Sequence, residues 1–388
     1  MDNDRISKER SQLVELASQP VSTRLKAYTK LCGPGWLQAA ITLGGGSLSS
    51  ALFLGVLTGY SMMWLQPLAM IMGIIMLSAI SYVTLSTEKR PFREINEHIS
   101  PVLGWGWLIA TLMANIVWCL PQFALGTAAV KQNLIPSLAQ SDIATYFIVA
   151  GLLAVALVVI WFYDSGSRGI QIFENILKGM VGLVVLCFLG VAVSLTLTEG
   201  GLPWGKVFKG FVPNLGLLSS PAAGFSETLV AAGDSAPFWK DRIVGQQQGV
   251  IMAAFATAVG INMTFLLPYS MLKKGWGREH RGLAIFDLST GLLIPFMIAT
   301  GCVVIAAASQ FHAQAKFEVG GEVNPKVAAA YAENLDALLG SQHGAEVYAG
   351  KSDAEKQKLR AGVPQADREV AAMIVKRDAW SLAVALQP

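Results

Sequence analysis

The chain has 388 residues, of which 53% are hydrophobic and 14% are charged, and its mean hydropathy is +0.49. Soluble domains usually carry about 25% charged residues, so this composition excludes an ordinary soluble enzyme and indicates an integral membrane protein in a lipid bilayer. The formal net charge of +3 is spread over the segments between apolar runs, and it indicates no nucleic-acid partner.

The uncharged runs predict transmembrane helices, because about 20 apolar residues cross the roughly 30 Å hydrocarbon core. A barrel strand would need only about 10 alternating residues, so the expected fold class is an all-α polytopic membrane protein. After a polar N-terminal segment (1–30), five helices are expected in residues 31–197, with two in 31–87 and the others in 99–130, 143–163 and 172–197. A loop (198–242) precedes two more helices in 243–272 and 288–315.

The last part of the chain differs in composition. Residues 316–378 are polar and rich in Ala, Lys, Glu and Asp, which predicts an extracytoplasmic loop with short amphipathic helices. Residues 379–388 begin another apolar helix, the eighth, that ten residues cannot complete. We therefore expect the chain to be truncated at Pro388; the alternative is a short C-terminal tail that lies on the surface.

The distribution of Lys and Arg predicts the orientation, because cytoplasmic loops carry an excess of them. With the N-terminus inside, the inner segments are rich in basic residues, whereas the outer loops are poor in them except for residues 198–242. The sequence predicts a multi-pass protein of the cell (inner) membrane, with a cytoplasmic N-terminus and seven crossings.

Three consecutive glycines, Gly44, Gly45 and Gly46, lie near the middle of the first run and are followed by Ser47. Each glycine costs roughly 1 kcal/mol of helix stability relative to Ala. Unwound backbone survives at membrane depth only where it is buried in protein or lines a cavity, and broken spans form the substrate site of many secondary transporters. The alternative interpretation is that the glycines let neighbouring helices pack closely.

Pro268 lies inside the sixth run, where it removes a backbone donor and clashes with the carbonyl four residues earlier. We therefore expect the second break there. The first and sixth helices open two consecutive five-helix sets, and matching breaks predict a broken-helix inverted-repeat (5+5) transporter fold with the second repeat truncated.

Ionisable residues are nearly absent from the apolar runs, so the polar atoms available at membrane depth are neutral. They belong to Gln38, Thr42, Ser47, Ser49, Ser50, Asn115, Gln122, Asn262 and Thr264. The alternative role of Asn115 and Gln122 is hydrogen bonding between helices. No nucleophile, base and orienting group occur together at membrane depth, so we expect neither an enzyme nor a cofactor, and the oligomeric state stays open.

Two motifs stand out in the first span, Gly33-Pro34-Gly35-Trp36-Leu37 at its start and Gly44-Gly45-Gly46-Ser47 at its middle. The first resembles the GPGFL of the Nramp family of divalent metal ion transporters, and the family's Asp-Pro-Gly-Asn falls on the second. Further matches are Gly59-Tyr60 with Trp64, Gly126-Thr127-Ala128, the loop Phe208-Lys209-Gly210-Phe211-Val212-Pro213, and Ala258-Val259-Gly260-Ile261. The last of these places the family's Met-Pro-His on Leu267-Pro268-Tyr269, and the resemblance covers about residues 33–308.

The resemblance implies which residues bind the substrate, and it shows where this chain differs from the family at those positions. The expected substrate-binding or ion-binding residues are Gln38, Gly44, Gly45, Ser47, Asn262, Thr264 and Leu267, with Gly44, Ser47 and Thr264 closest to the metal. Where the family has Asp and Met, this chain has Gly44 and Leu267, so a carboxylate and a soft thioether ligand are missing. The positions that the family uses for protons hold Met113, Leu120, Phe123 and Tyr269.

These departures resemble those of the Nramp-related magnesium transporters, which take a largely hydrated ion. The resemblance implies transport of a divalent cation such as Mg²⁺ or Mn²⁺ by alternating access, without proton coupling. Two alternatives stay open. One is transport of an amino acid or other small organic solute, because helix amino ends at a break favour a carboxylate. The other is a non-transporting membrane sensor or scaffold.

Overall fold

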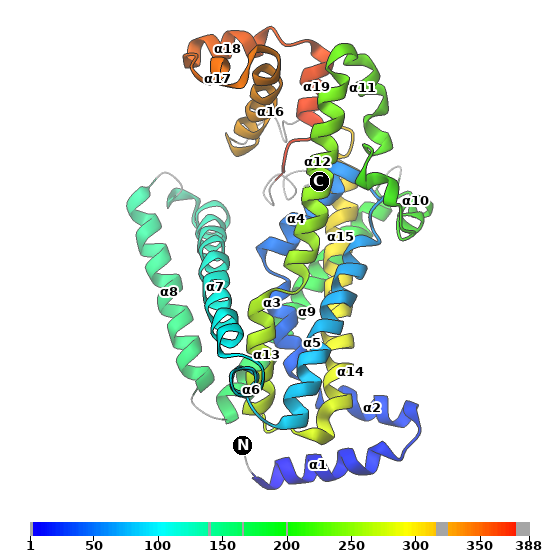
Figure 1. Cartoon of the computed structure of the whole chain (residues 1–388), viewed down its shortest axis with the longest axis vertical. Coiled ribbons are helices and arrows are strands. Elements are labelled where there is room, and N and C mark those ends of the chain that lie inside the picture. Colours follow the sequence, from blue (N-terminus) through cyan, green and yellow to red (C-terminus); the bar gives the residue numbers. More distant parts are fainter. Residues whose placement is uncertain (1–2, 139–140, 165–166, 199–200, 316–324, 378–388) are drawn as a thin grey trace. The chain divides into compact units, whose positions relative to one another are not determined.

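The computed structural model describes residues 3–138, 141–164, 167–198, 201–315 and 325–377. Every regular element in these ranges is a helix (Figure 1), so the all-α prediction is confirmed. The chain divides into two compact units. Unit 1 comprises Met1–Gly45, Met70–Val185 and Ala258–Phe296, and unit 2 comprises Gly46–Ala69, Leu186–Thr257 and Met297–Pro388.

Unit 1 is built around a short helix, α3, that packs on α13 and α14, while α7 packs on α6, α8 and α13. The complete helices of this unit are α1 (Asn3–Ala17), α2 (Val21–Leu31), α3 (Pro34–Thr42), α6 (Pro91–His98), α7 (Pro101–Ala129), α8 (Asp142–Asp164), α13 (Ile261–Lys273) and α14 (Arg281–Gly291). Most of α5 (Leu65–Thr87) and the first part of α9 (Ser167–Leu197) also belong to it.

Unit 2 has a hydrophobic core to which the polar C-terminal helices contribute. Its helices are α4 (Gly45–Thr58), α10 (Trp204–Lys209), α11 (Ser226–Ala231), α12 (Ala236–Ala258), α15 (Leu293–Phe311), α16 (Pro325–His343), α17 (Ala345–Ala349), α18 (Asp353–Ala361) and α19 (Gln365–Met373). Leu335 and Val370 join Ile243 in one buried cluster. Trp239 Nε1 donates to Asp367 Oδ1 at 2.7 Å, so the predicted polar loop is a folded part of the unit.

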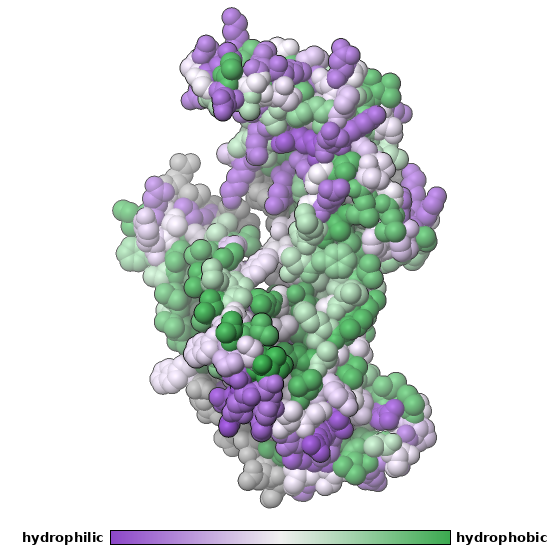
Figure 2. Space-filling model, in the orientation of Figure 1, coloured by the Kyte–Doolittle hydropathy of each residue, from purple (hydrophilic) through white to green (hydrophobic). Residues whose placement is uncertain are grey.

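The long helices expose apolar side chains, as helices that face lipid do. In the most apolar stretch of α8 no residue is buried, whereas 72% of the corresponding stretch of Arg278–Phe311 is buried. Figure 2 shows hydrophobic side chains over the long helices and hydrophilic ones over α16 to α18. Within the described residues, six helices have the length and hydropathy of a membrane span, or seven if the broken pair α3 and α4 is one span. The chain is a multi-pass membrane protein.

Some boundaries differ from the sequence prediction. The seventh apolar run forms two helices that meet at Leu292. The four cysteines are free thiols, and two of them, Cys119 on α7 and Cys187 on α9, are exposed. The predicted apolar helix at 379–388 and the beginning of the predicted polar loop, 316–324, lie outside the described residues.

Candidate ion site at two broken helices

The first span is interrupted where the sequence predicts, but over fewer residues. α3 ends at Thr42, and α4 begins at Gly45. Leu43 leaves the helical conformation with φ −76° and ψ 32°, while its N–H still binds the carbonyl of Ala39 at 2.9 Å. Gly44 therefore lies in the break, whereas Gly45 and Gly46 form the first turn of α4.

The second interruption is not at Pro268, and that prediction is wrong. Pro268 lies within α13, whereas α12 ends at Ala258 and α13 begins at Ile261. Gly260 is extended there, with φ −81° and ψ 159°. A proline removes one helical hydrogen bond, which a helix can lose without ending, whereas the extended backbone at Gly260 ends the ladder of bonds. The residues next to the break are consequently Ile261 to Thr264 rather than Leu267.

The two interruptions meet inside unit 1. The hydroxyl Oγ1 of Thr42 lies 3.3 Å from the carbonyl oxygen of Ala258, to which it donates, and 3.5 Å from the Sδ of Met263. Thr42 and Met263 are each 2% exposed, and Ala258 is fully buried. The Ala258 carbonyl ends α12 and is one of the carbonyls that a helix leaves without an internal partner. A hydroxyl, a carbonyl and a thioether thus converge at a buried place.

Gln38 lies one helical turn before Thr42 and is fully buried. Neither atom of its amide group has a hydrogen-bond partner among the described residues. On the other side, α7 covers the break closely. A methyl group on Gly44 would lie 3.4 Å from Gln122 Nε2, and one on Gly45 would lie 2.1 Å from Leu125 Cδ1. A side chain on Gly45 would therefore require Leu125 of α7 to change its conformation.

Ser47 belongs to unit 2, where it lies on α4. It is 4% exposed, and its hydroxyl donates to the carbonyl of Thr257 at 3.1 Å. Thr257 and Ala258 are the last two residues of α12. Each of two consecutive carbonyls at the end of α12 therefore accepts a hydrogen bond from a hydroxyl of the first span.

The other predicted ligands have different surroundings. Asn262 Oδ1 accepts the N–H of Met263 at 3.0 Å. The Thr264 hydroxyl accepts from Trp107 Nε1 at 3.3 Å and donates to the carbonyl of Ile261 at 2.6 Å. Leu267 is 1% exposed and has an aliphatic side chain, so it offers no ligand atom. Of this group, Asn262 and Thr264 lie next to the second break, but Asn262 Oδ1 and the Thr264 hydroxyl are already hydrogen-bonded within the protein.

The sequence predicts neither Met263 nor the Ala258 carbonyl at the site, and it offers Thr42 as an available polar residue but not among the expected ion-binding residues. The available signal was Gly260, a lone glycine inside an apolar run that can mark a helix boundary. Counting from that glycine would have placed Met263 in the first turn after the break. Leu267, which the sequence predicts as a binding residue, lies one helical turn beyond Met263 on α13.

Two other features in the described ranges could suggest an ion site, and both are less suitable. On α6, ligand atoms of Glu94, Glu97 and His98 lie within 4.8 Å of one another. However, Glu94 pairs with Lys89 at 3.2 Å and Glu97 pairs with Arg93 at 2.6 Å, so these carboxylates are already neutralised.

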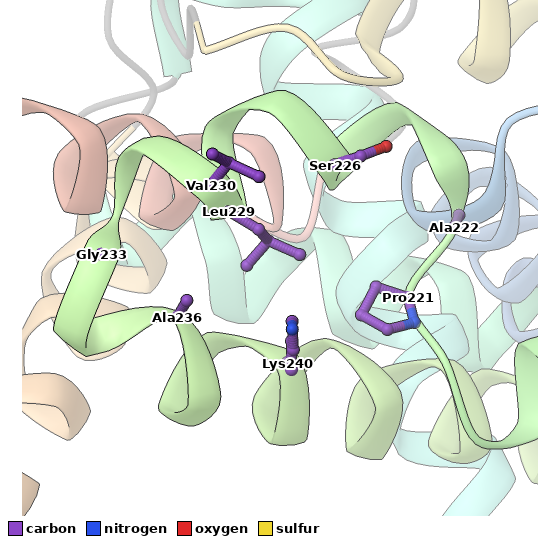
Figure 3. Close-up of a pocket in the computed structure, with 8 residues that line it drawn as sticks. All are labelled: Pro221, Ala222, Ser226, Leu229, Val230, Gly233, Ala236 and Lys240. Carbon is purple, nitrogen blue, oxygen red and sulfur yellow. The ribbon is translucent and has the colours of Figure 1, made fainter.

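A pocket of about 420 Å³ lies in unit 2 (Figure 3). Its lining residues are Pro221, Ala222, Ser226, Leu229, Val230, Gly233, Ala236 and Lys240. The charged member of this lining is Lys240, and no acidic residue is among these eight. A cation would be repelled from it, so the junction of the two breaks is the better candidate site.

Comparisons with known proteins show which family the chain resembles. Residues 35–348 match the family model described as natural resistance-associated macrophage protein-like, Nramp. The chain is 24% identical over 192 residues to the divalent metal cation transporter MntH of Brucella suis biovar 1 (strain 1330), and 27% identical over 193 residues to the manganese transporter pdt1 of Schizosaccharomyces pombe (strain 972 / ATCC 24843). These matches cover 49% of the chain each, and 38% and 35% of the two relatives.

Solved structures show a similar fold. A mutant of the Eremococcus coleocola manganese transporter aligns with a TM-score of 0.54 at 14% identity, covering 95% of this chain and 65% of that one. The same transporter in complex with an aromatic bis-isothiourea substituted compound aligns with a TM-score of 0.52 at 15% identity and the same coverage. Because the family model matches most of its residues, the chain belongs to the Nramp family.

Proposed function

We propose that this chain moves a divalent metal cation across the membrane by alternating access, and that the ion binds where the two broken spans meet. The observation that carries the proposal is the convergence of Thr42 Oγ1, the Ala258 carbonyl and Met263 Sδ at a buried place. Membership of the Nramp family supports it, as do the names of the two relatives, one a divalent metal cation transporter and the other a manganese transporter.

Met263 sets the expected preference among ions. A thioether is a soft ligand and favours transition metals over Mg²⁺, which takes oxygen ligands and keeps its waters. The departure at Leu267 suggested a site without sulfur, but Met263 supplies a sulfur atom one turn earlier. We therefore expect Mn²⁺ to be preferred to Mg²⁺. Gln38 and Gly44, which lie in unit 1 with the break, would contact the water shell of the ion.

The site has no formal charge of its own, because the residues that converge on it are neutral. The α7 positions that would carry protons hold Met113, Leu120 and Phe123. We propose that transport is not coupled to protons. The basic residues of the inner segments support a cytoplasmic N-terminus in the cell (inner) membrane.

Uptake into proteoliposomes tests the proposal. Purified full-length chain would be reconstituted in vesicles that hold a Mn²⁺-sensitive or Mg²⁺-sensitive dye, with a pH-sensitive dye in parallel vesicles. We expect saturable Mn²⁺ uptake, slower Mg²⁺ uptake and no accompanying acidification. Absence of flux for every divalent cation, with a cooperative thermal unfolding transition that shows intact fold, would overturn the proposal. Thermal protection by an amino acid, rather than by any metal, would favour the organic-solute alternative.

A further inference from the structure

The start of α3 is held by a buried carboxylate from another helix. Asp287 lies on α14 and is 1% exposed, and its two oxygens accept the backbone N–H groups of Gly33 at 3.2 Å and Gly35 at 2.6 Å. The first N–H groups of a helix have no partner inside the helix, and a negative charge at this end is favourable. Gly33, which precedes α3, has no side chain to bind them, so Asp287 supplies the cap that the local sequence lacks.

An ion pair lies beside this cap. Lys274 follows the last residue of α13, and its Nζ is 3.1 Å from Glu174 Oε2 on α9, with both side chains less than one-fifth exposed. Lys178, one turn further along α9, donates to the carbonyl of Cys32 at 3.2 Å. Asp287, Lys274, Glu174 and Lys178 together form what we term the polar clamp.

The residues of the polar clamp pack closely against Gly33 and Gly35 at the start of α3. A methyl group on Gly35 would lie 2.5 Å from the backbone oxygen of Asp287, and one on Gly33 would lie 2.0 Å from Lys274 Nζ. Gly35 must therefore be a glycine for α14 to approach α3 this closely. The contact is between backbone groups, so it leaves little freedom for the first turn of α3 to shift.

Two short helices connect the polar clamp with the ion site. α3 has the clamp at Gly35 and the site at Thr42, about 10 Å apart at 1.5 Å per residue. α13 has Met263 at the site and Lys274, directly after its last residue, at the clamp, about 17 Å apart. A helix of this length moves as one rod, so a displacement at the clamp is carried to the atoms that bind the ion.

We propose that Asp287 is a positioning residue for the ion site. By fixing the first turn of α3, Asp287 sets the distance from Thr42 to Ala258 and Met263. Because the same helix carries the clamp and the site, binding of the ion favours the closed clamp, and the closed clamp favours binding of the ion. The inference rests on the proposed function. Cys32 lies directly before the capped Gly33 and is half-buried, with its Sγ 3.1 Å from the carbonyl of Tyr28, so its reactivity reports whether the clamp is closed.

The test uses full-length protein in which Cys119, Cys187 and Cys302 are replaced by Ser, which leaves Cys32 as the remaining thiol. Asp287→Asn keeps the size of the side chain and removes its charge. We expect the Mn²⁺ concentration for half-maximal uptake to rise about tenfold, the effect of losing a charge-assisted hydrogen bond, with a smaller change in maximal rate. We also expect Mn²⁺ to slow maleimide labelling of Cys32 in the parent but not in Asp287→Asn. Because Asp287 itself contacts the Cys32 thiol, the labelling rate without Mn²⁺ is compared between the parent and Glu174→Gln, which we expect to be labelled faster.

The controls separate positioning from general damage. Ser81→Ala removes a fully buried hydroxyl elsewhere in unit 1, where it bonds its own helix at Leu77, and it should change neither readout. Asp287→Glu should recover part of the Mn²⁺ affinity because it restores the charge. If Asp287→Asn does not fold, Glu174→Gln weakens the polar clamp at its ion pair and is expected to give the same two changes.

The two proposals can fail separately. Unchanged labelling of Cys32 together with an unchanged half-maximal Mn²⁺ concentration, in whichever of these variants folds, would overturn the positioning role while leaving transport intact. If the parent protein moves no divalent cation, the proposed function fails. In that case labelling of Cys32 still decides whether Asp287 holds α3, but the link to an ion site is overturned.

Discussion

Met263 brings a sulfur atom to a junction whose other donors are oxygens. Its Sδ is 3.5 Å from Thr42 Oγ1, and the side chain is 2% exposed. A buried thioether would be an ordinary core side chain if it faced only carbon atoms. Beside a hydroxyl and a helix-terminal carbonyl it forms a mixed donor set, which is the chemistry that distinguishes transition metals from Mg²⁺.

Met263→Leu tests this distinction, because the exchange conserves volume and usually costs less than about 1.5 kcal/mol of stability. We expect the half-maximal concentration for Mn²⁺ uptake to rise about tenfold and that for Mg²⁺ to change little, because sulfur contributes to binding of the softer ion. Competitive uptake of the two ions measures the ratio. Met271→Leu is the matched control, since Met271 is fully buried on the same helix. Equal effects of the two substitutions would contradict a ligand role for Met263.

The packing of helices depends on where glycines permit close approach. On α4, a methyl group at Gly55 would lie 2.6 Å from the carbonyl of Val304 and 2.8 Å from Ala307 Cβ on α15. On α7, a methyl group at Gly106 would meet no atom within 4 Å among the described residues. The two glycines have the same helical conformation and differ in what surrounds them.

Gly55→Ala should therefore destabilise the protein by about 1–3 kcal/mol, the cost of overpacking a tight contact. Gly106→Ala should be neutral or stabilising by up to about 1 kcal/mol, because Ala is the better helix former. Thermal unfolding of the two variants in the same detergent measures the difference. If both melt at the temperature of the parent, α4 and α15 are not packed as closely as the structure indicates.

How far the sequence predicts the elements depends on whether the signal is local. The long helices follow from the length of the apolar runs, and the first break follows from Gly44 and its neighbours. The second break was misplaced because proline is a stronger local signal than a single glycine, yet α13 runs through Pro268. Which residues of one break contact which residues of the other depends on tertiary packing, and a local sequence pattern does not specify it.

The candidate site shows the same limit. Gln38, Gly44 and Ser47 were predicted, and the structure places Gln38 and Gly44 near the break, with Ser47 on the following helix. Glu174 and Lys178 are spaced as a helix-surface ion pair, but Glu174 pairs with Lys274, a hundred residues away in the sequence. The polar clamp joins the start of α3, α9 and the pair α13 and α14, three regions that are far apart along the chain, so no local sequence pattern predicts it.

At the scale of the whole molecule, the polar C-terminal helices form a folded part of unit 2. Asp336 on α16 accepts hydrogen bonds from Tyr348 at 2.6 Å and from Arg360 at 2.6 and 2.7 Å, and so joins α17 and α18 to α16. Burial alone would raise the pKa of Asp336, but the hydrogen bonds from Arg360 and Tyr348 outweigh it, and the pKa lies below its ordinary value.

A lowered pKa in the folded state means that this tie contributes stability above the ordinary Asp pKa of about 3.9 and loses it as the pH falls through the folded value. Because the pair is about one-third exposed, we expect its contribution to be about 1 kcal/mol or less. The protection factors for hydrogen exchange of residues 345–361, which divide out the intrinsic pH dependence of amide exchange, should be lower at a pH below about 4 than at neutral pH. Asp336→Asn should remove most of this difference, whereas Asp353→Asn, at an exposed position of α18, should not. Identical protection factors at both pH values in the parent would contradict the assignment.

The neutral donors at the junction of the two breaks have an electrical consequence. A dication that crosses without a counter-charge on its ligands, and without an exchanged proton, carries two elementary charges through the field of the membrane. At about 2.3 kcal/mol per charge for each 100 mV, a membrane potential of about 100 mV supplies about 4.6 kcal/mol to a dication. This energy corresponds to a concentration of the dication that is roughly three orders of magnitude higher inside a negatively polarised cell than outside. Voltage, rather than a pH gradient, would then be the energy source that this arrangement of Thr42, Ala258 and Met263 uses.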